Sequence, residues 1–213
     1  MSSTEAKTTA KRDVGFVERF RESVGEDFTI TTWVLIPIGI GINAIGGFIA
    51  STLKLPLFLD NIGTMLIGIL AGPWAAMLTG GFANVIQAML GNPVQLAFLP
   101  VPVAIGFVTG VLARRGWFDS PKKVVVPALV LTVVATLIAT PIVVLVFGGV
   151  TSSGTSLVTA TLVATGRSLV ESAASAQLMV EFVDKGGSAF VAYFIGRSVP
   201  TRYLPPQGQD IYS

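Results

Sequence analysis

Residues 33–200 form a nearly unbroken series of apolar stretches with few charges between them. The whole chain is 52% hydrophobic and 12% charged, and its mean hydropathy is +0.74. A soluble domain carries about 25% charged residues, and its surface helices show a polar stripe with a period of about 3.6 residues. That stripe is mostly missing here, as expected when lipid replaces water as the solvent. The sequence therefore predicts an all-α integral membrane protein.

Turn signals and charged loops divide the apolar region into segments of the length that crosses a bilayer. A spanning helix needs about 20 mainly apolar residues, and fewer when it ends at polar loops. We predict six transmembrane helices, with an extra semi-polar helical segment between the fifth and the sixth. The predicted transmembrane helices are 32–53, 57–71, 73–90, 94–113, 124–147 and 176–198, and the extra segment is 157–175.

The distribution of Lys and Arg predicts the orientation, because cytoplasmic loops carry an excess of these residues. With the N-terminus inside, eleven of the fourteen basic residues fall in inner segments. We therefore expect a multi-pass protein of the cell (plasma) membrane with cytoplasmic N- and C-termini. The predicted domains are a cytoplasmic N-terminal arm at 1–30, a six-helix membrane domain at 31–200 and a cytoplasmic tail at 201–213. Helical spacing of apolar residues in the arm predicts a short amphipathic helix over 13–26: Phe16, Val17, Phe20 and Val24.

Several kinds of chemistry are not expected from the residue types present. The chain has no cysteine and no histidine, which removes disulfides, thiol catalysis, typical zinc sites and histidine acid–base catalysis. No GxxxxGK[ST] sequence occurs, so we expect no ATPase site of its own. The basic residues form no stripe for nucleic acid. The sequence therefore predicts a protein that is not an enzyme and has no cofactor and no metal.

Ionisable side chains at membrane depth are costly, so they usually line a site or pair with one another. Glu181, Asp184 and Lys185 occupy positions i, i+3 and i+4, which places them on one helix face. Arg167 and Glu171 repeat the i, i+4 spacing on the preceding segment. Together with nearby amides they predict a substrate site near the outer face. The candidate substrate-binding residues are Asp60, Asn61, Asn84, Gln87, Asn92, Gln95, Arg167, Glu171, Glu181, Asp184 and Lys185.

Each of these candidates also has a structural interpretation. The pairs Glu181–Lys185 and Arg167–Glu171 can be ion pairs that neutralise the outer ends of helices. Three further residues have local alternatives: a helix–helix hydrogen bond for Asn84, a turn for Asn92, and an N-cap of the second helix for Asp60.

Small residues form a row on the first predicted helix, at Gly39, Asn43, Gly47 and Ser51. Rows of this kind let helix backbones approach closely in lipid. The row is denser in glycine than internal packing needs, so we predict that it is a face for docking another membrane protein.

Several segments resemble the substrate-binding S components of energy-coupling factor (ECF) transporters. They include LPLFLDNIGT at 55–64 and EFVDKGGS at 181–188, together with GPWAA at 72–76, Gly80, Asn84 and the segment 147–155. The resemblance covers about residues 33–200. It implies six transmembrane helices, a site for a vitamin or related micronutrient near the outer face, and partners that comprise a membrane coupling subunit and two ATPase subunits. It also implies that the row of small residues contacts the coupling subunit.

The predicted function is therefore a membrane substrate-binding (S) subunit of an ECF-type ABC importer, which captures a micronutrient for ATP-driven uptake by partner subunits. The predicted outer-half charges sum to −1, which favours a neutral or cationic substrate because buried like charges repel. Two alternatives remain: a membrane ligand-sensing or scaffold domain without transport, and a solitary secondary carrier. Whether the segment 157–175 lies on the membrane or enters it also stays open.

Overall fold

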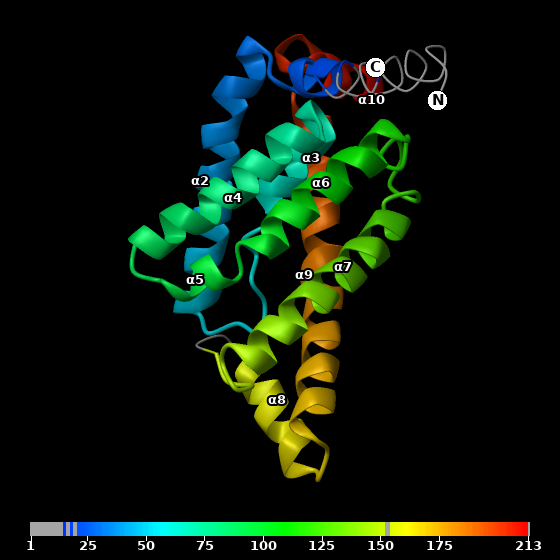
Figure 1. The fold of residues 1–213 in the computed structure, drawn as a ribbon. Helices are drawn as coiled ribbons and strands as arrows, with labels where there is room; N and C mark the ends of the chain where they lie inside the picture. The colour runs from blue at the N-terminus through cyan, green and yellow to red at the C-terminus, as the bar shows by residue number, and fades with distance from the viewer. Residues whose placement is uncertain (1–14, 16–17, 19–20, 152–153, 213) are drawn as a thin grey trace, which may run out of the picture.

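Every regular element in the described part of the chain is a helix, which confirms the predicted all-α fold (Figure 1). The structure is a computed structural model that describes residues 15, 18, 21–151 and 154–212. The named elements are α2 (Ile30–Thr52), α3 (Ile62–Ala71), α4 (Pro73–Met89), α5 (Val94–Ala97), α6 (Pro100–Arg114), α7 (Val125–Leu145), α8 (Thr155–Ala164), α9 (Leu169–Ser198), η1 (Thr201–Tyr203) and α10 (Pro206–Tyr212).

The N-terminal arm is described only in part. Residues 21–27 are helical, in agreement with the end of the helix predicted over 13–26. Phe16, Val17 and Phe20, which carried that prediction with Val24, lie outside the described residues.

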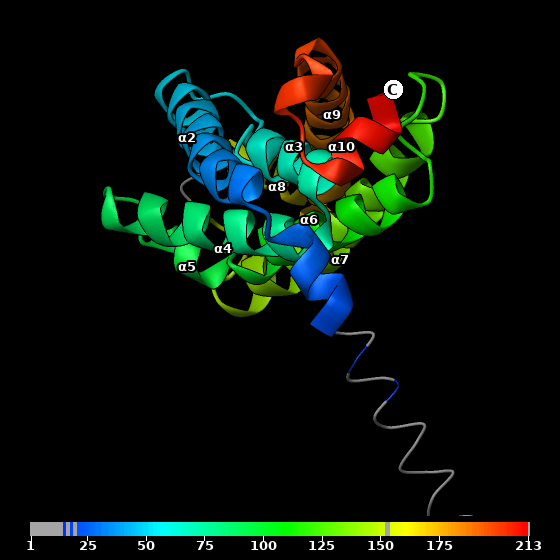
Figure 2. The same cartoon turned by 90° about the horizontal axis from the view of Figure 1, so that it is seen from above.

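Helix α3 lies at the centre of the bundle. Nine of its ten residues are buried, and it packs against α2, α4, α6 and α9, which surround it when the molecule is seen from above (Figure 2). Its sequence, IGTMLIGILA, contains no charge and therefore has no face that requires water.

Small residues allow close helix contacts around this centre. A Cβ atom at Gly80 of α4 would lie 2.7 Å from the carbonyl oxygen of Pro102 in α6, and one at Gly106 would lie 2.6 Å from the backbone of Ala76. Both distances are shorter than ordinary contacts, so the two backbones meet where no larger side chain fits.

Two predicted transmembrane helices are shorter or interrupted in the structure. The second begins at Ile62 rather than at residue 57, because residues 53–61 form an irregular loop. The fourth is divided into α5 and α6 at Phe98 and Leu99. Pro100 and Pro102 follow this break, and proline lacks the N–H that continues a helix.

The last long helix begins seven residues before its predicted start at residue 176. Helix α8 ends at Ala164, and α9 begins at Leu169. Gly166 has a φ of +88°, which suits a helix C-terminus. Ser168 and Glu171 then form a capping box at the start of α9. Residues 169–175 therefore belong to the 30-residue helix α9 and not to the preceding segment.

Among the described residues, two helices, α2 and α7, are long and apolar enough to cross a membrane, with mean hydropathies of 1.9 and 2.6 over 18 residues. Helices α3, α6 and α8 are shorter apolar helices of 10 to 15 residues.

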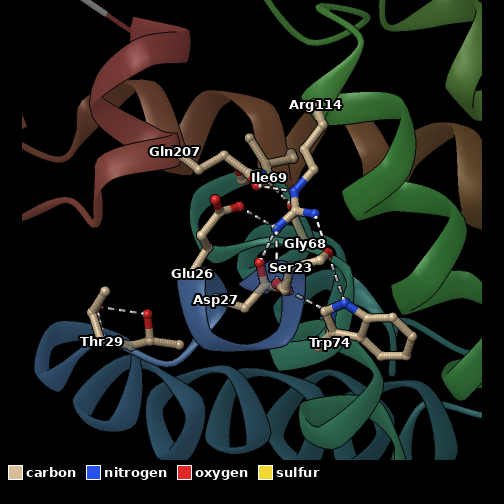
Figure 3. A network of polar contacts seen from close by, with 10 residues as sticks. Ser23, Glu26, Asp27, Thr29, Gly68, Ile69, Trp74, Arg114 and Gln207 are labelled. Carbon is tan, nitrogen blue, oxygen red and sulfur yellow. Dashed lines mark hydrogen bonds and ion pairs between the residues drawn. The ribbon is translucent and has the colours of Figure 1, made fainter. Parts of the chain in front are cut away.

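A polar network joins the N-terminal helical stretch, the C-terminal helix and the central helices at one end of the molecule (Figures 1 and 3). We call it the terminal clasp; it comprises Ser23, Asp27, Trp74, Arg114 and Gln207. The carboxylate of Asp27 accepts from the Trp74 amide at 2.7 Å, at the start of α4, and pairs with the guanidinium of Arg114. Arg114 also donates to Ser23 and to Gln207, at 2.9 and 3.1 Å.

The clasp supplies partners to helix ends that would otherwise lack them. Asp27 caps the N-terminus of α4, while the Gln207 amide donates to the carbonyls of Gly68 and Ile69 at the end of α3. Burial raises the pKa of the Asp27 carboxyl above its ordinary value of 3.8, and the Trp74 amide and the Arg114 charge oppose that rise. The clasp thus fixes both terminal segments to the bundle.

Candidate functional site

A cavity of about 860 Å³ lies in the other half of the bundle, away from the terminal clasp. Its walls come from the C-terminal part of α2, the loop 53–61, α4 to α8 and the middle of α9. A volume of this size suits a small organic molecule. The polar and charged lining residues are Ser51, Lys54, Asp60, Asn61, Asn84, Gln87, Asn92, Gln95, Thr151, Thr155, Ser156, Thr159, Gln177, Glu181 and Lys185.

Three charged residues of α9 are buried at the inner side of the cavity: Glu181 and Lys185 line it, and Asp184 lies behind them. Lys185 Nζ lies 2.7 Å from Asp184 Oδ2 and 3.0 Å from Glu181 Oε2, so one ammonium forms ion pairs with two carboxylates. This confirms that Glu181 reaches Lys185 across one helical turn. The Lys185 ammonium also lies 5.6 Å from the centre of the Phe58 ring, in the loop 53–61.

Asp184 holds the loop 53–61 in place. Its Oδ1 atom accepts from the backbone amides of Phe58 and Leu59 at 2.9 and 2.8 Å. Leu59 has a φ of +53°, a left-handed conformation that is uncommon for a leucine. The carboxylate therefore stabilises an unfavourable backbone conformation, and the loop it holds carries Phe58 and Asp60 to the cavity wall.

Asp60 organises the amides on the opposite wall. Its two oxygens accept from the side-chain amides of Asn61 and Gln95, at 2.6 and 3.3 Å. Gln95 also donates to Gln87 Oε1 at 3.3 Å, while the Asn84 amide donates to the Gln95 carbonyl at 3.0 Å. These bonds join the loop 53–61, α4 and α5 into one polar wall.

Four buried atoms of this lining have no hydrogen-bond partner within the described part of the chain: Asn61 Oδ1, Gln87 Nε2, Gln177 Oε1 and Glu181 Oε2. Glu181 Oε2 has the ion pair with Lys185 but no hydrogen bond of suitable geometry. Buried polar atoms are normally hydrogen-bonded, because leaving one unpaired costs about 1–3 kcal/mol. A bound molecule with complementary groups would remove this cost.

Eight of the eleven predicted substrate-binding residues line the cavity: Asp60, Asn61, Asn84, Gln87, Asn92, Gln95, Glu181 and Lys185. Asp184 lies behind this lining, where it holds the loop 53–61. The structure does not bring Arg167 and Glu171 to the cavity. Both are exposed at the turn between α8 and α9, and Glu171 accepts from the Ser168 amide in the capping box. No ion pair joins Arg167 to Glu171, both of which are described.

The four residues of the predicted docking row on α2 differ in exposure, and their contact with a partner subunit stays a prediction. Gly39 and Asn43 are buried, and a Cβ at Gly39 would lie 2.7 Å from Ile67 of α3. Gly47 and Ser51 line the cavity. The small residues of the row let α2 pack closely against α3 and leave room for the cavity below.

Asn43, rather than Asp60, caps the start of α3. The amides of Gly63 and Thr64 donate to Asn43 Oδ1 at 2.7 and 3.3 Å, and Asn43 Nδ2 donates to the Thr64 hydroxyl at 2.7 Å. The cap thus comes from another helix, which a local sequence pattern for N-caps does not reveal.

Several residues that line the cavity were not among the predicted substrate-binding residues. Gln177 is the main example. It is 2% exposed and lies one turn before Glu181 on α9, so its spacing of four residues was an available signal. Thr155 and Thr159 of α8 are also buried at the cavity. Their contribution depends on how α8 folds back on α9, and a sequence pattern does not contain that information.

The arrangement is suited to binding rather than to covalent chemistry. Amide, hydroxyl and charged groups surround one space together with apolar side chains such as Phe58, Phe98 and Val143. Among the described residues, no group of three or more His, Cys, Asp or Glu is placed to hold a metal ion.

Comparison with known proteins agrees with this assignment. A protein-family model described as "ECF transporter, substrate-specific component" matches residues 31–196. The chain has no match among the curated proteins or among the solved structures. The matched region contains α2 except its first residue, α3 to α8, nearly all of α9 and the whole cavity lining. The chain therefore belongs to the family of substrate-specific components of ECF transporters.

Proposed function

We propose that this protein captures a vitamin or related micronutrient, neutral or cationic, in the cavity at the outer side of the cell membrane. A membrane coupling subunit and two ATPase subunits then drive its uptake. The observation that carries the proposal is the cavity itself, with four buried polar atoms that lack a hydrogen-bond partner among the described residues.

The proposed topology has six transmembrane helices and cytoplasmic termini. The stretch 21–27 and α10 lie at the same end of the bundle, and the loop after α6 with its basic residues lies near that end (Figure 1). Basic residues concentrate on the cytoplasmic side of membrane proteins. The cavity would then open toward the outside, since it lies in the other half of the bundle.

An uptake assay tests the transport function. Cells that express this chain together with the coupling subunit and the ATPases should accumulate the micronutrient, and cells that express this chain alone should not. Uptake by the chain alone, abolished by an ionophore, would instead support a solitary carrier. Binding without accumulation in either strain would support a sensor or scaffold.

The compound itself can be found by mass spectrometry of small molecules released from the purified protein, with a mock purification as the control. One enriched compound is the expected result. Unlabelled excess of that compound should then compete with uptake in the strain that contains all the subunits, and failure to compete would contradict the proposal.

A further inference from the structure

Negative charge exceeds positive charge around the cavity. Asp60, Glu181, Asp184 and Lys185 are each at most 8% exposed, and their formal charges sum to −2. Lys185 is shared between Asp184 and Glu181. Asp60 takes part in no ion pair with any described residue, and Lys54, at the rim, is exposed. A buried charge without an ion-pair partner is costly, so the excess of carboxylates around the cavity favours the binding of a cation.

The orientations of the wall amides follow from Asp60. An ionised carboxylate only accepts hydrogen bonds, so the atoms of Asn61 and Gln95 that face it must be their NH₂ groups. The same NH₂ group of Gln95 donates to Gln87, which fixes the oxygen of Gln87 on that side. The unpartnered atoms are therefore an oxygen on Asn61 and an NH₂ group on Gln87.

Acceptors outnumber donors among the described lining atoms that lack a hydrogen bond. Asn61 and Gln177 each present an oxygen, Glu181 presents the oxygen that is ion-paired with Lys185, and Gln87 presents a donor. A molecule that satisfies this set must bring several N–H or O–H donors and one acceptor.

The remaining wall is apolar and the space is large, which fits an organic molecule better than a metal ion. The cavity has a volume of about 860 Å³, and its apolar lining includes Phe58, Phe98, Val101 and Val143. No cluster among the described residues has the ligands for a metal ion. We propose that the substrate is an organic cation with N–H donors, whose charged group lies between Asp60 and Glu181. This inference rests on the proposed function, because it names the chemical class of the compound taken up.

Three fragments of nearly the same shape test the sign of the charge: benzamidinium, benzamide and benzoate. Each is added to the intact protein in detergent at about 10 mM, because small fragments bind weakly. Benzamidinium should raise the Tm, benzamide should raise it less, and benzoate should leave it unchanged. Equal or greater stabilisation by benzamide or benzoate, or no stabilisation by benzamidinium, overturns the inference.

Variants test the position of the charge. Asp60→Asn and Glu181→Gln should each weaken benzamidinium binding by about tenfold or more, which is about 1.4 kcal/mol or more. Asp119→Asn makes the same change as Asp60→Asn at a half-exposed position in the loop after α6 and should have no effect. If Asp60→Asn does not fold, the benzamidinium affinity of Glu181→Gln tests the inference. Unchanged affinity in the folded variants overturns the inference.

Different results contradict the cation inference and the proposed importer function. A neutral or anionic compound released from the protein overturns the cation inference and leaves the importer proposal intact. Failure of uptake in the presence of all partner subunits contradicts the importer proposal, whatever the fragments do.

Discussion

The two ends of this bundle bury a similar group in different ways. At the terminal clasp, Asp27 is 1% exposed and has both an arginine and a backbone amide as partners. At the cavity, Asp60 is 8% exposed and has only neutral amides. A fully paired buried carboxylate links the segments that it joins. A buried carboxylate without a cation can still gain stabilising interactions from a bound molecule. The contrast distinguishes the half that holds the fold together from the half where we propose that the substrate binds.

The largest expected effect comes from breaking the terminal clasp. Arg114→Met leaves the Asp27 carboxylate buried without its cation and should lower the free energy of unfolding by about 3 kcal/mol. Chemical unfolding in detergent measures this, with Arg115→Met at the neighbouring exposed position as the control. Adding Asp27→Asn should restore part of the loss, because it removes the unpaired charge. No restoration would show that the pair is not the cause.

The pH dependence of the same variant has a definite sign. The folded pKa of Asp27 is raised, so the folded state binds the proton more tightly and the unfolding free energy falls as pH rises above about 3.8. The Arg114 charge lowers this pKa, so the Arg114→Met variant has a still higher Asp27 pKa. The pH range over which the unfolding free energy falls therefore extends to higher pH. The loss caused by Arg114→Met should therefore be smaller at about pH 4 than at pH 7. An equal loss at both pH values would contradict this account.

A smaller effect is expected behind the cavity. Asp184→Asn removes the charge that holds the Phe58 and Leu59 amides and pairs with Lys185, and it should cost about 2 kcal/mol of stability. Limited proteolysis should also show faster cleavage in the loop 53–61, whose anchor is weakened. Asp119→Asn is the matched control. A variant as stable as the original chain would mean that the loop does not depend on this carboxylate.

Asp60→Asn sharpens the comparison, because its effect on stability should be small and of the opposite sign. Without ligand we expect the unfolding free energy to stay unchanged or to rise by up to about 1 kcal/mol, since a buried charge without a cation is removed. The stabilisation by the bound compound should fall at the same time. A loss of about 2 kcal/mol or more without ligand would indicate that Asp60 is a structural residue like Asp27.

The smallest effect is expected at the start of α9. Glu171→Gln keeps the capping box, in which glutamine also serves, and lies outside the cavity lining. Stability should change by less than about 0.5 kcal/mol. The amount of compound that co-purifies should equal that of the unmodified protein. A marked loss of the compound would return Glu171 to the binding site.

Periodicity and spacing predicted the helical fold and much of the cavity lining, because both depend on local order along one helix. Glu181, Asp184 and Lys185 share a face through the geometry of a single helix, and their burial follows from the scarcity of charge around them. The Ser168–Glu171 capping box was also present in the sequence, and it marks the true start of α9.

The sequence did not predict which residues of different helices contact one another. The small residues of α2 predicted a close approach, and the tertiary structure showed that Gly39 makes one with α3 of the same chain. The same holds for Asn43 as the cap of α3, for Asp184 as the anchor of the loop 53–61, and for Asp27 with Arg114. Each links residues at least 20 positions apart, and nothing in the local pattern specifies which distant group will meet an unpaired amide or charge.

The sequence by itself determined that this chain is helical, apolar and provided with a few costly charges, because solvent and helix geometry act residue by residue. The tertiary structure decided which of those charges are satisfied. Asp27 and Asp60 are both aspartates next to apolar helices in the sequence. The fold alone places an arginine beside Asp27 and a cavity beside Asp60.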